Sequence, residues 1–195
     1  MINSVRYNLS SLTDFSGRDA RQTFWFYILF VFVVQYAIGI AVALPMIVGI
    51  FTTTFDAVSS GADPDTLSAE MLEGMTGYLE LQMWVSAIVS LVAVLLVVAA
   101  FVRRLHDAGF SGWIAAIPVA TQIFSVGYSI VMFDEIMAIA AESMNPANPA
   151  NPAAMQIEAH PLSLVGWVGY LVVIGFGILK SQHGPNRYGG EPVHH

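Results

Sequence analysis

The chain has 195 residues, of which 56% are hydrophobic and only 11% are charged, and its formal net charge is −7. A soluble domain carries about 25% charged residues, so this chain lacks the polar surface that a water-soluble protein needs. Its mean hydropathy of +0.66 agrees. The acidic balance argues against nucleic acid as a partner. The absence of cysteine excludes disulfides and thiolate metal sites.

Four long apolar stretches follow one another along the chain. They cover residues 24–51, 81–102, 113–133 and 162–179. Each is long enough to cross the ~30 Å hydrocarbon core of a bilayer as a helix. A soluble four-helix bundle would need a polar face on every helix, and Leu91 to Val102 contains no polar residue. We therefore expect an all-α integral membrane protein, one polytopic domain of residues 1–195 with four transmembrane helices in antiparallel hairpins.

The basic residues predict the orientation of these helices. All seven lie before the first stretch, between the second and third, or after the fourth: Arg6, Arg18, Arg21, Arg103, Arg104, Lys180 and Arg187. The outer loops 52–80 and 134–161 hold acidic residues and no basic one. Because Lys and Arg in short loops stay in the cytoplasm, both termini are expected there. One tryptophan near the start of each stretch (Trp25, Trp84, Trp113 and Trp167) fits four membrane interfaces.

Local signals predict where some helices begin and end. Ser16 and Asp19 match a capping box, which would start the first helix near Gly17. Gly109 is expected to stop the second membrane helix and Ser111 to cap the third. Residues 5–12 suggest a short interfacial segment, and residues 66–78 a short acidic helix outside the membrane. The Asn-Pro-Ala repeats of residues 145–153 favour an extended spacer.

Three cytoplasmic segments resemble a bacterial inner-membrane family called domain of unknown function 805. They are Phe15 to Arg18 with Arg21 and the aromatic residues 24–27; residues 103–107 with Gly109 and residues 111–113; and Gly184, residues 186–189 and Pro192. The resemblance covers most of the chain except the outer loops, where residues 134–161 look like a longer, repeat-bearing insertion. It implies a small protein of about four spans in the inner (cytoplasmic) membrane of a bacterium, with no established activity and no catalytic residues to carry over.

The same three segments suggest an anion-binding site on the cytoplasmic face. Arginine forks suit phosphate, so a phospholipid headgroup or a phosphorylated small molecule is the expected ligand. The candidate residues are Arg18, Arg21, Arg103, Arg104, His106, Asp107, Asn186 and Arg187. The competing interpretation is structural. In it the arginines fix the orientation and contact phosphates, Asp107 pairs with one of them, and the glycines form turns.

Other function classes have weaker support. His106 and Asp107 are adjacent on a helix and point in different directions, so they make a poor catalytic pair. No nucleophile or metal motif accompanies them, and we expect no enzyme activity, cofactor or metal. A small-solute transporter or channel component is the alternative, although the four stretches contain no ionisable residue. Glycines in the fourth stretch leave open a partnership with other membrane proteins or a homo-oligomer.

Overall fold

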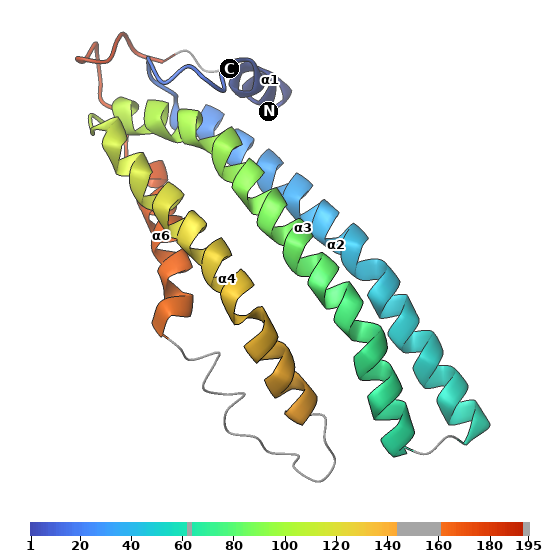
Figure 1. The fold of residues 1–195 in the computed structure, drawn as a ribbon. Coiled ribbons are helices and arrows are strands. Elements are labelled where there is room, and N and C mark those ends of the chain that lie inside the picture. Colours follow the sequence, from blue (N-terminus) through green and yellow to red (C-terminus); the bar gives the residue numbers. More distant parts are fainter. Residues whose placement is uncertain (62–63, 144–160, 193–195) are drawn as a thin grey trace. The chain divides into compact units, whose positions relative to one another are not determined.

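The computed structural model describes residues 1–61, 64–143 and 161–192, with backbone alone for residues 64–75 and 140–143. Its elements in chain order are α1 (Ile2–Ser10), α2 (Arg21–Ser60), α3 (Pro64–Asp107), η1 (Gly112–Ala115), α4 (Ala116–Ser143), η2 (Pro161–Leu164) and α6 (Val165–Ile178) (Figure 1). The only extended pairing in these ranges is an isolated bridge between Asn186 and Gly189. The all-α prediction is confirmed.

Four helical segments are long and apolar enough to cross a membrane. They are Arg21–Ser60, Thr76–Asp107, Gly112–Ile139 and Pro161–Ile178. At most 22% of the apolar window in each segment is buried inside the protein. Apolar side chains left exposed on this scale need hydrocarbon around them, because a soluble monomer rarely exposes a continuous apolar surface of this size. The chain is therefore a multi-pass membrane protein.

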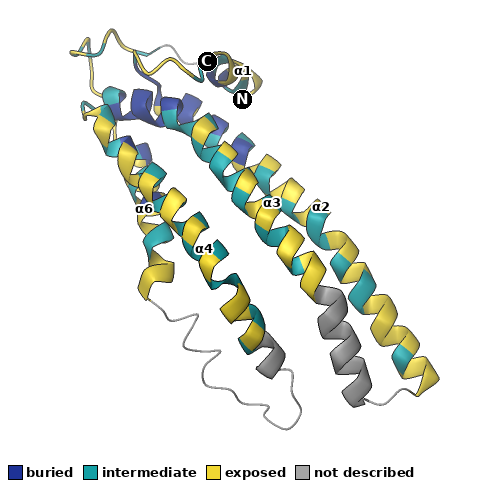
Figure 2. Cartoon of the chain, in the orientation of Figure 1, coloured by how far each residue is buried: buried dark blue, intermediate teal, exposed yellow. Residues whose placement is uncertain are grey.

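The first compact unit combines residues 1–36, 89–125 and 164–195. Its core lies where α2 begins and α3 ends, which Figure 2 shows as the dark blue region. Phe24, Tyr27, Phe101 and Leu105 are each at most 1% exposed and form the centre of this core. The Tyr27 hydroxyl donates to the Leu96 carbonyl at 3.0 Å, which ties α2 to α3. This unit positions all the residues of the candidate site.

The second compact unit combines residues 37–88 and 126–163. It holds the far halves of α2 and α4 and the first half of α3. None of its side chains that the structure describes is buried, whereas large apolar ones such as Phe51 (71% exposed) and Val131 (78% exposed) face outward. This surface composition suits contact with lipid tails.

Several expected boundaries differ from the structure. The helices extend past the apolar stretches: α2 continues to Ser60 and α4 to Ser143, through residues expected in the outer loops. Residues 66–78 are helical, but they form the beginning of α3 and not a separate helix. Asn145–Ala153, the expected spacer, lies outside the described residues.

Two capping predictions are wrong and one is confirmed. The first membrane helix starts at Arg21 and not near Gly17, because Ser16 bonds to Asp14 and Asp19 bonds to an arginine described below. Ser111 precedes η1 but its side chain makes no capping hydrogen bond. Gly109 does end α3: its φ is +84°, and its N–H donates to the His106 carbonyl at 3.1 Å. A left-handed residue at this position suits glycine.

Candidate functional site

Three arginines are buried at one end of the first unit. Arg103 and Arg104 are at most 1% exposed, and Arg18 is 6% exposed. Arg18 precedes α2, whereas Arg103 and Arg104 occupy the last turns of α3. A buried guanidinium must find partners for its five N–H groups, because burial of an unpaired charge is very costly. The partners of these three side chains therefore determine how this end of the protein is built.

Asp107 is the acceptor that joins two of the arginines. Its Oδ1 accepts from Nε and Nη2 of Arg18 at 3.1 and 3.0 Å. Its Oδ2 accepts from Nη1 of Arg104 and from the Ser181 hydroxyl. Four donors fill the acceptor capacity of one carboxylate. Because Ser181 follows α6, this fully buried side chain links the segment before α2, the end of α3 and the C-terminal segment.

Arg18 also binds the C-terminal segment through backbone oxygens. Its Nη1 donates to the Gly184 carbonyl at 2.7 Å, and its Nη2 donates to the Gln182 carbonyl at 2.5 Å. The Gln182 N–H in turn donates to the Asp107 carbonyl at 2.9 Å. Residues 182–189 are thus held beside α3 mainly by hydrogen bonds to Arg18 and Asp107.

Arg103 performs the same role for the N-terminal segment. Its Nε donates to Oδ2 of Asp19 at 3.1 Å, and its Nη2 donates to Oδ1 of Asn8 in α1 at 2.6 Å. Its Nη1 donates to the Ser11 carbonyl at 2.9 Å and to the Asp14 carbonyl. The Asp19 N–H completes the contact by donating to the Arg103 carbonyl at 3.1 Å. These bonds dock α1 and the following turn onto the end of α3.

Arg104 caps the C-terminal end of α6. Its Nε donates to the Gly177 carbonyl at 3.2 Å, and its Nη2 donates to the Leu179 carbonyl. The last carbonyls of a helix lack partners and carry partial negative charge, so a cation placed there is stabilising. Gly177 allows close packing, because a Cβ at that position would lie 2.9 Å from the rings of Phe24 and Trp25. Trp25 also donates to the Gly177 carbonyl at 3.1 Å.

His106 belongs to a second layer, outside the arginines. Its ring stacks on Tyr188 with centroids 3.8 Å apart and planes 8° apart. Its Nδ1 lies 3.3 Å from the Gly17 carbonyl, and its backbone carbonyl accepts from Nδ2 of Asn186 at 2.9 Å. The ring stacking and these two polar contacts hold the three segments against one another.

We call Arg18, Asp19, Arg103, Arg104 and Asp107 the buried ionic cluster. Three cations share two carboxylates within it, and backbone carbonyls together with the side-chain oxygen of Asn8 supply the remaining acceptors. The first unit as a whole contains seven basic and four acidic residues, a formal charge of +3. The second unit contains the other ten acidic residues and no basic one. All basic residues are therefore confined to the first unit, which contains the buried ionic cluster.

The structure separates the predicted anion-site residues into two groups. It brings together Arg18, Arg103, Arg104, His106, Asp107 and Asn186 through the contacts above. Arg21 and Arg187 are exposed, and Arg187 lies 4.6 Å from the centre of the Tyr188 ring. Asp107 pairs with two arginines, where the sequence suggested one. The anion site itself stays a prediction for these residues.

Several residues of this end were missed by the sequence analysis. The capping-box spacing predicts Asp19 as a helix cap, but Asp19 is the counter-ion of Arg103. Asn8 and Ser181 supply side-chain contacts to the cluster, and no local pattern marks either residue. The one usable signal was the charge of Asp19, which lies between the basic residues Arg18 and Arg21.

The chain matches the family model described as "Protein of unknown function (DUF805)" over residues 12–190. The chain belongs to this family. No curated protein and no solved structure matches it. The matched region includes every residue of the buried ionic cluster, while all of α1 precedes it. The DUF805 family assignment brings no activity with it, so function must be argued from the site.

Proposed function

We propose that this DUF805 protein is a non-catalytic protein of the bacterial cytoplasmic membrane, with both termini in the cytoplasm, whose basic face binds an anionic phospholipid headgroup. Confinement of all seven basic residues to one unit supports the orientation, because Lys and Arg near span ends remain on the cytoplasmic side. The anionic surface of that leaflet attracts such a face.

The proposal rests on one observation: some basic residues are buried and bind protein groups, whereas others are exposed and form no ion pair. Arg18, Arg103 and Arg104 direct their donors to carboxylates and carbonyls, so they build the face. Arg21 and Lys180 are exposed, and neither forms an ion pair with another described residue.

Two observations connect these exposed cations with Arg104. The charge of Arg21 acts on Arg104, and Lys180 directly follows Leu179, whose carbonyl Arg104 binds. Two cations held near one point at headgroup depth match a phosphodiester, which needs charge but no buried contact. We therefore assign headgroup binding to Arg21 and Lys180 and not to the buried arginines.

Native mass spectrometry of purified protein tests this assignment. The protein is exchanged into nanodiscs that contain phosphatidylcholine with a minor fraction of phosphatidylglycerol, and retained lipids are counted. Each cation near the surface contributes about 1 kcal/mol, so Arg21→Gln with Lys180→Gln should weaken phosphatidylglycerol retention roughly thirtyfold. The charge-preserving pair Arg21→Lys with Lys180→Arg is the matched control and should retain it. Equal retention by the neutralised variant and the wild type would reject the proposal.

A further inference from the structure

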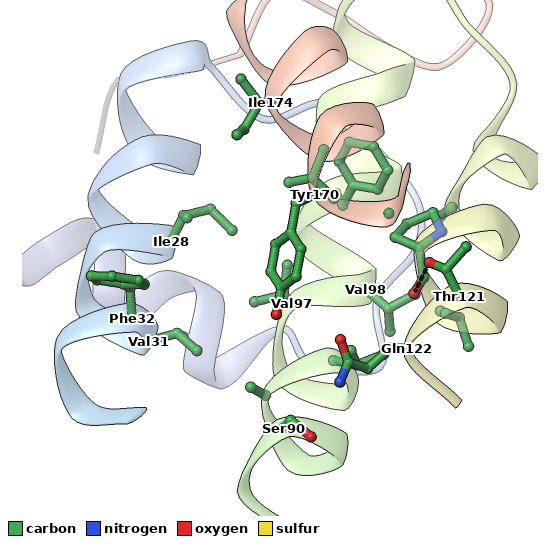
Figure 3. A pocket seen from close by; sticks show the side chains of 18 of the residues that line it. Ile28, Val31, Phe32, Ser90, Val97, Val98, Thr121, Gln122, Tyr170 and Ile174 are labelled. Carbon is green, nitrogen blue, oxygen red and sulfur yellow. Dashed lines mark hydrogen bonds between the residues drawn. The ribbon is translucent and has the colours of Figure 1, made fainter. Parts of the chain in front are cut away.

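A pocket lies within the membrane-spanning part of the first unit, away from the buried ionic cluster. It has a cavity volume of ≈ 420 Å³ and is bounded by α2, α3, α4 and α6 (Figure 3). This volume falls in the range of roughly 300–1,000 Å³ that small-molecule sites occupy. Leu29, Phe32 and Ile174 line it and are each about half exposed, so the pocket opens sideways toward the surrounding hydrocarbon. An occupant can therefore enter from the bilayer.

Most of the lining is apolar or aromatic, but five polar side chains interrupt it. Besides the small Ser90 and Thr121 there are three larger ones. They are Gln35 of α2, Gln122 of α4 and Tyr170 of α6. Figure 3 shows the Gln122 carboxamide and the Tyr170 hydroxyl on the walls around the space above Ser90. None of the three forms a hydrogen bond with another residue in the described ranges. Together they offer five N–H or O–H donors, because each carboxamide has two and the phenol has one.

The depth of these donors excludes an ordinary phospholipid as their partner. Gln35 lies fourteen residues beyond Arg21, roughly 20 Å along the helix at 1.5 Å per residue. In a ~30 Å core this is nearer to the middle than to the headgroups, where the ester carbonyls of a phospholipid are found. A polar group left unsatisfied in hydrocarbon costs several kcal/mol. The donors therefore require an occupant with acceptors at mid-membrane depth.

We propose that this pocket binds a lipid-soluble carbonyl compound with a planar, otherwise apolar body, which is the chemistry of a quinone. Its carbonyl oxygens accept from Gln122 and Tyr170. Its ring lies among the aromatic side chains of the lining, which include Trp25, Phe32 and Phe101. Aromatic rings favour stacked or edge contacts with another flat ring, whereas a saturated acyl chain gains nothing specific from them. The proposal concerns binding alone and is independent of the headgroup site.

Trp25 provides a built-in reporter, because it lines the pocket and the other three tryptophans do not. Replacement of the exposed Trp84, Trp113 and Trp167 by Phe leaves a protein with this one fluorophore. Titration of that protein in detergent with a naphthoquinone bearing a short isoprenoid tail should quench its fluorescence to saturation. Loss of one hydrogen bond should weaken the fitted affinity about three- to tenfold in Gln122→Leu and in Tyr170→Phe.

A pair of matched variants separates the pocket from non-specific partition into the micelle. Val94 lines the pocket, whereas Val92, two residues earlier in α3, is exposed and does not. Val94→Phe fills the cavity and should abolish saturable quenching, while Val92→Phe should leave it unchanged. Quenching that rises linearly with quinone, or that is the same in both variants, would overturn the proposal. So would unaltered affinity in both Gln122→Leu and Tyr170→Phe, the result expected if lipid chains or a second copy of the protein fill the pocket.

Discussion

Neutralisation of Asp107 should lower the stability of the first unit more than the removal of any other single charge. The carboxylate is fully buried and accepts four hydrogen bonds, from Arg18 (twice), Arg104 and Ser181. Asp107→Asn keeps the shape but leaves two buried guanidinium groups without their counter-ion. Removal of one partner from a buried ion pair costs about 3–5 kcal/mol. Because the Asn retains one acceptor oxygen, we expect the lower end of that range, about 3 kcal/mol.

Equilibrium unfolding in mixed micelles of dodecyl maltoside and SDS gives this quantity as a change in the free energy of unfolding. Asp14→Asn is the matched control, because the Asp14 carboxylate is exposed and, among the described residues, accepts hydrogen bonds only from the backbone N–H and the hydroxyl of Ser16. The triple variant Arg18→Met, Arg104→Met and Asp107→Leu should recover much of the loss, since apolar replacement of a whole buried ionic triad is often nearly neutral. A loss below about 1 kcal/mol in Asp107→Asn would refute the view that the cluster holds this end together.

Three further predictions address the segments that the cluster organises. Arg103→Met removes the bonds that dock α1, so amides of Ile2–Ser10 should exchange with solvent at least about tenfold faster, while Arg6→Met, an exposed control, should not change them. Burial raises the pKa of the Tyr7 phenol above its ordinary value of 10.0, and the Asp19 charge acts in the same direction. The stability that depends on neutral Tyr7 is therefore present below pH 10 and lost above it. Tyr7→Phe should reduce this fall in the free energy of unfolding at alkaline pH. Gly109→Ala forces a left-handed backbone and should cost about 1–2 kcal/mol in the same assay, whereas Gly190→Ala, with open space and no positive φ, should cost little.

The membrane fold followed from the sequence because its signal is local. An apolar run such as residues 91–102 identifies a membrane helix without knowledge of its neighbours. The ends of the helices were harder to predict. Ser16 and Asp19 satisfy the spacing of a capping box, but Arg103 competes for Asp19 and the helix starts later. A tertiary ion pair overrides a local capping preference when both groups are buried.

The buried ionic cluster was only partly foreseeable for a similar reason. The sequence shows which residue types are present, and hairpin topology predicts that they gather on one face of the membrane. The pairing could not, because the partners are far apart in sequence: 89 residues separate Arg18 from Asp107, and 84 separate Asp19 from Arg103. Nor did sequence indicate that Arg104 would cap α6, since that contact depends on where the helix ends in space. Tertiary packing, and not spacing in the sequence, determines which residues become partners.

Thiol accessibility in intact cells tests the membrane topology on which this account rests. The protein has no cysteine, so a single introduced thiol reports one position without background. Thr13 before α2 and Ser60 at the end of α2 are both exposed and suit this purpose. With a membrane-impermeant maleimide added to bacterial spheroplasts, Ser60→Cys should be labelled, and Thr13→Cys should be labelled only after lysis. Labelling of Thr13→Cys before lysis, with Ser60→Cys protected, would contradict the proposed cytoplasmic basic face.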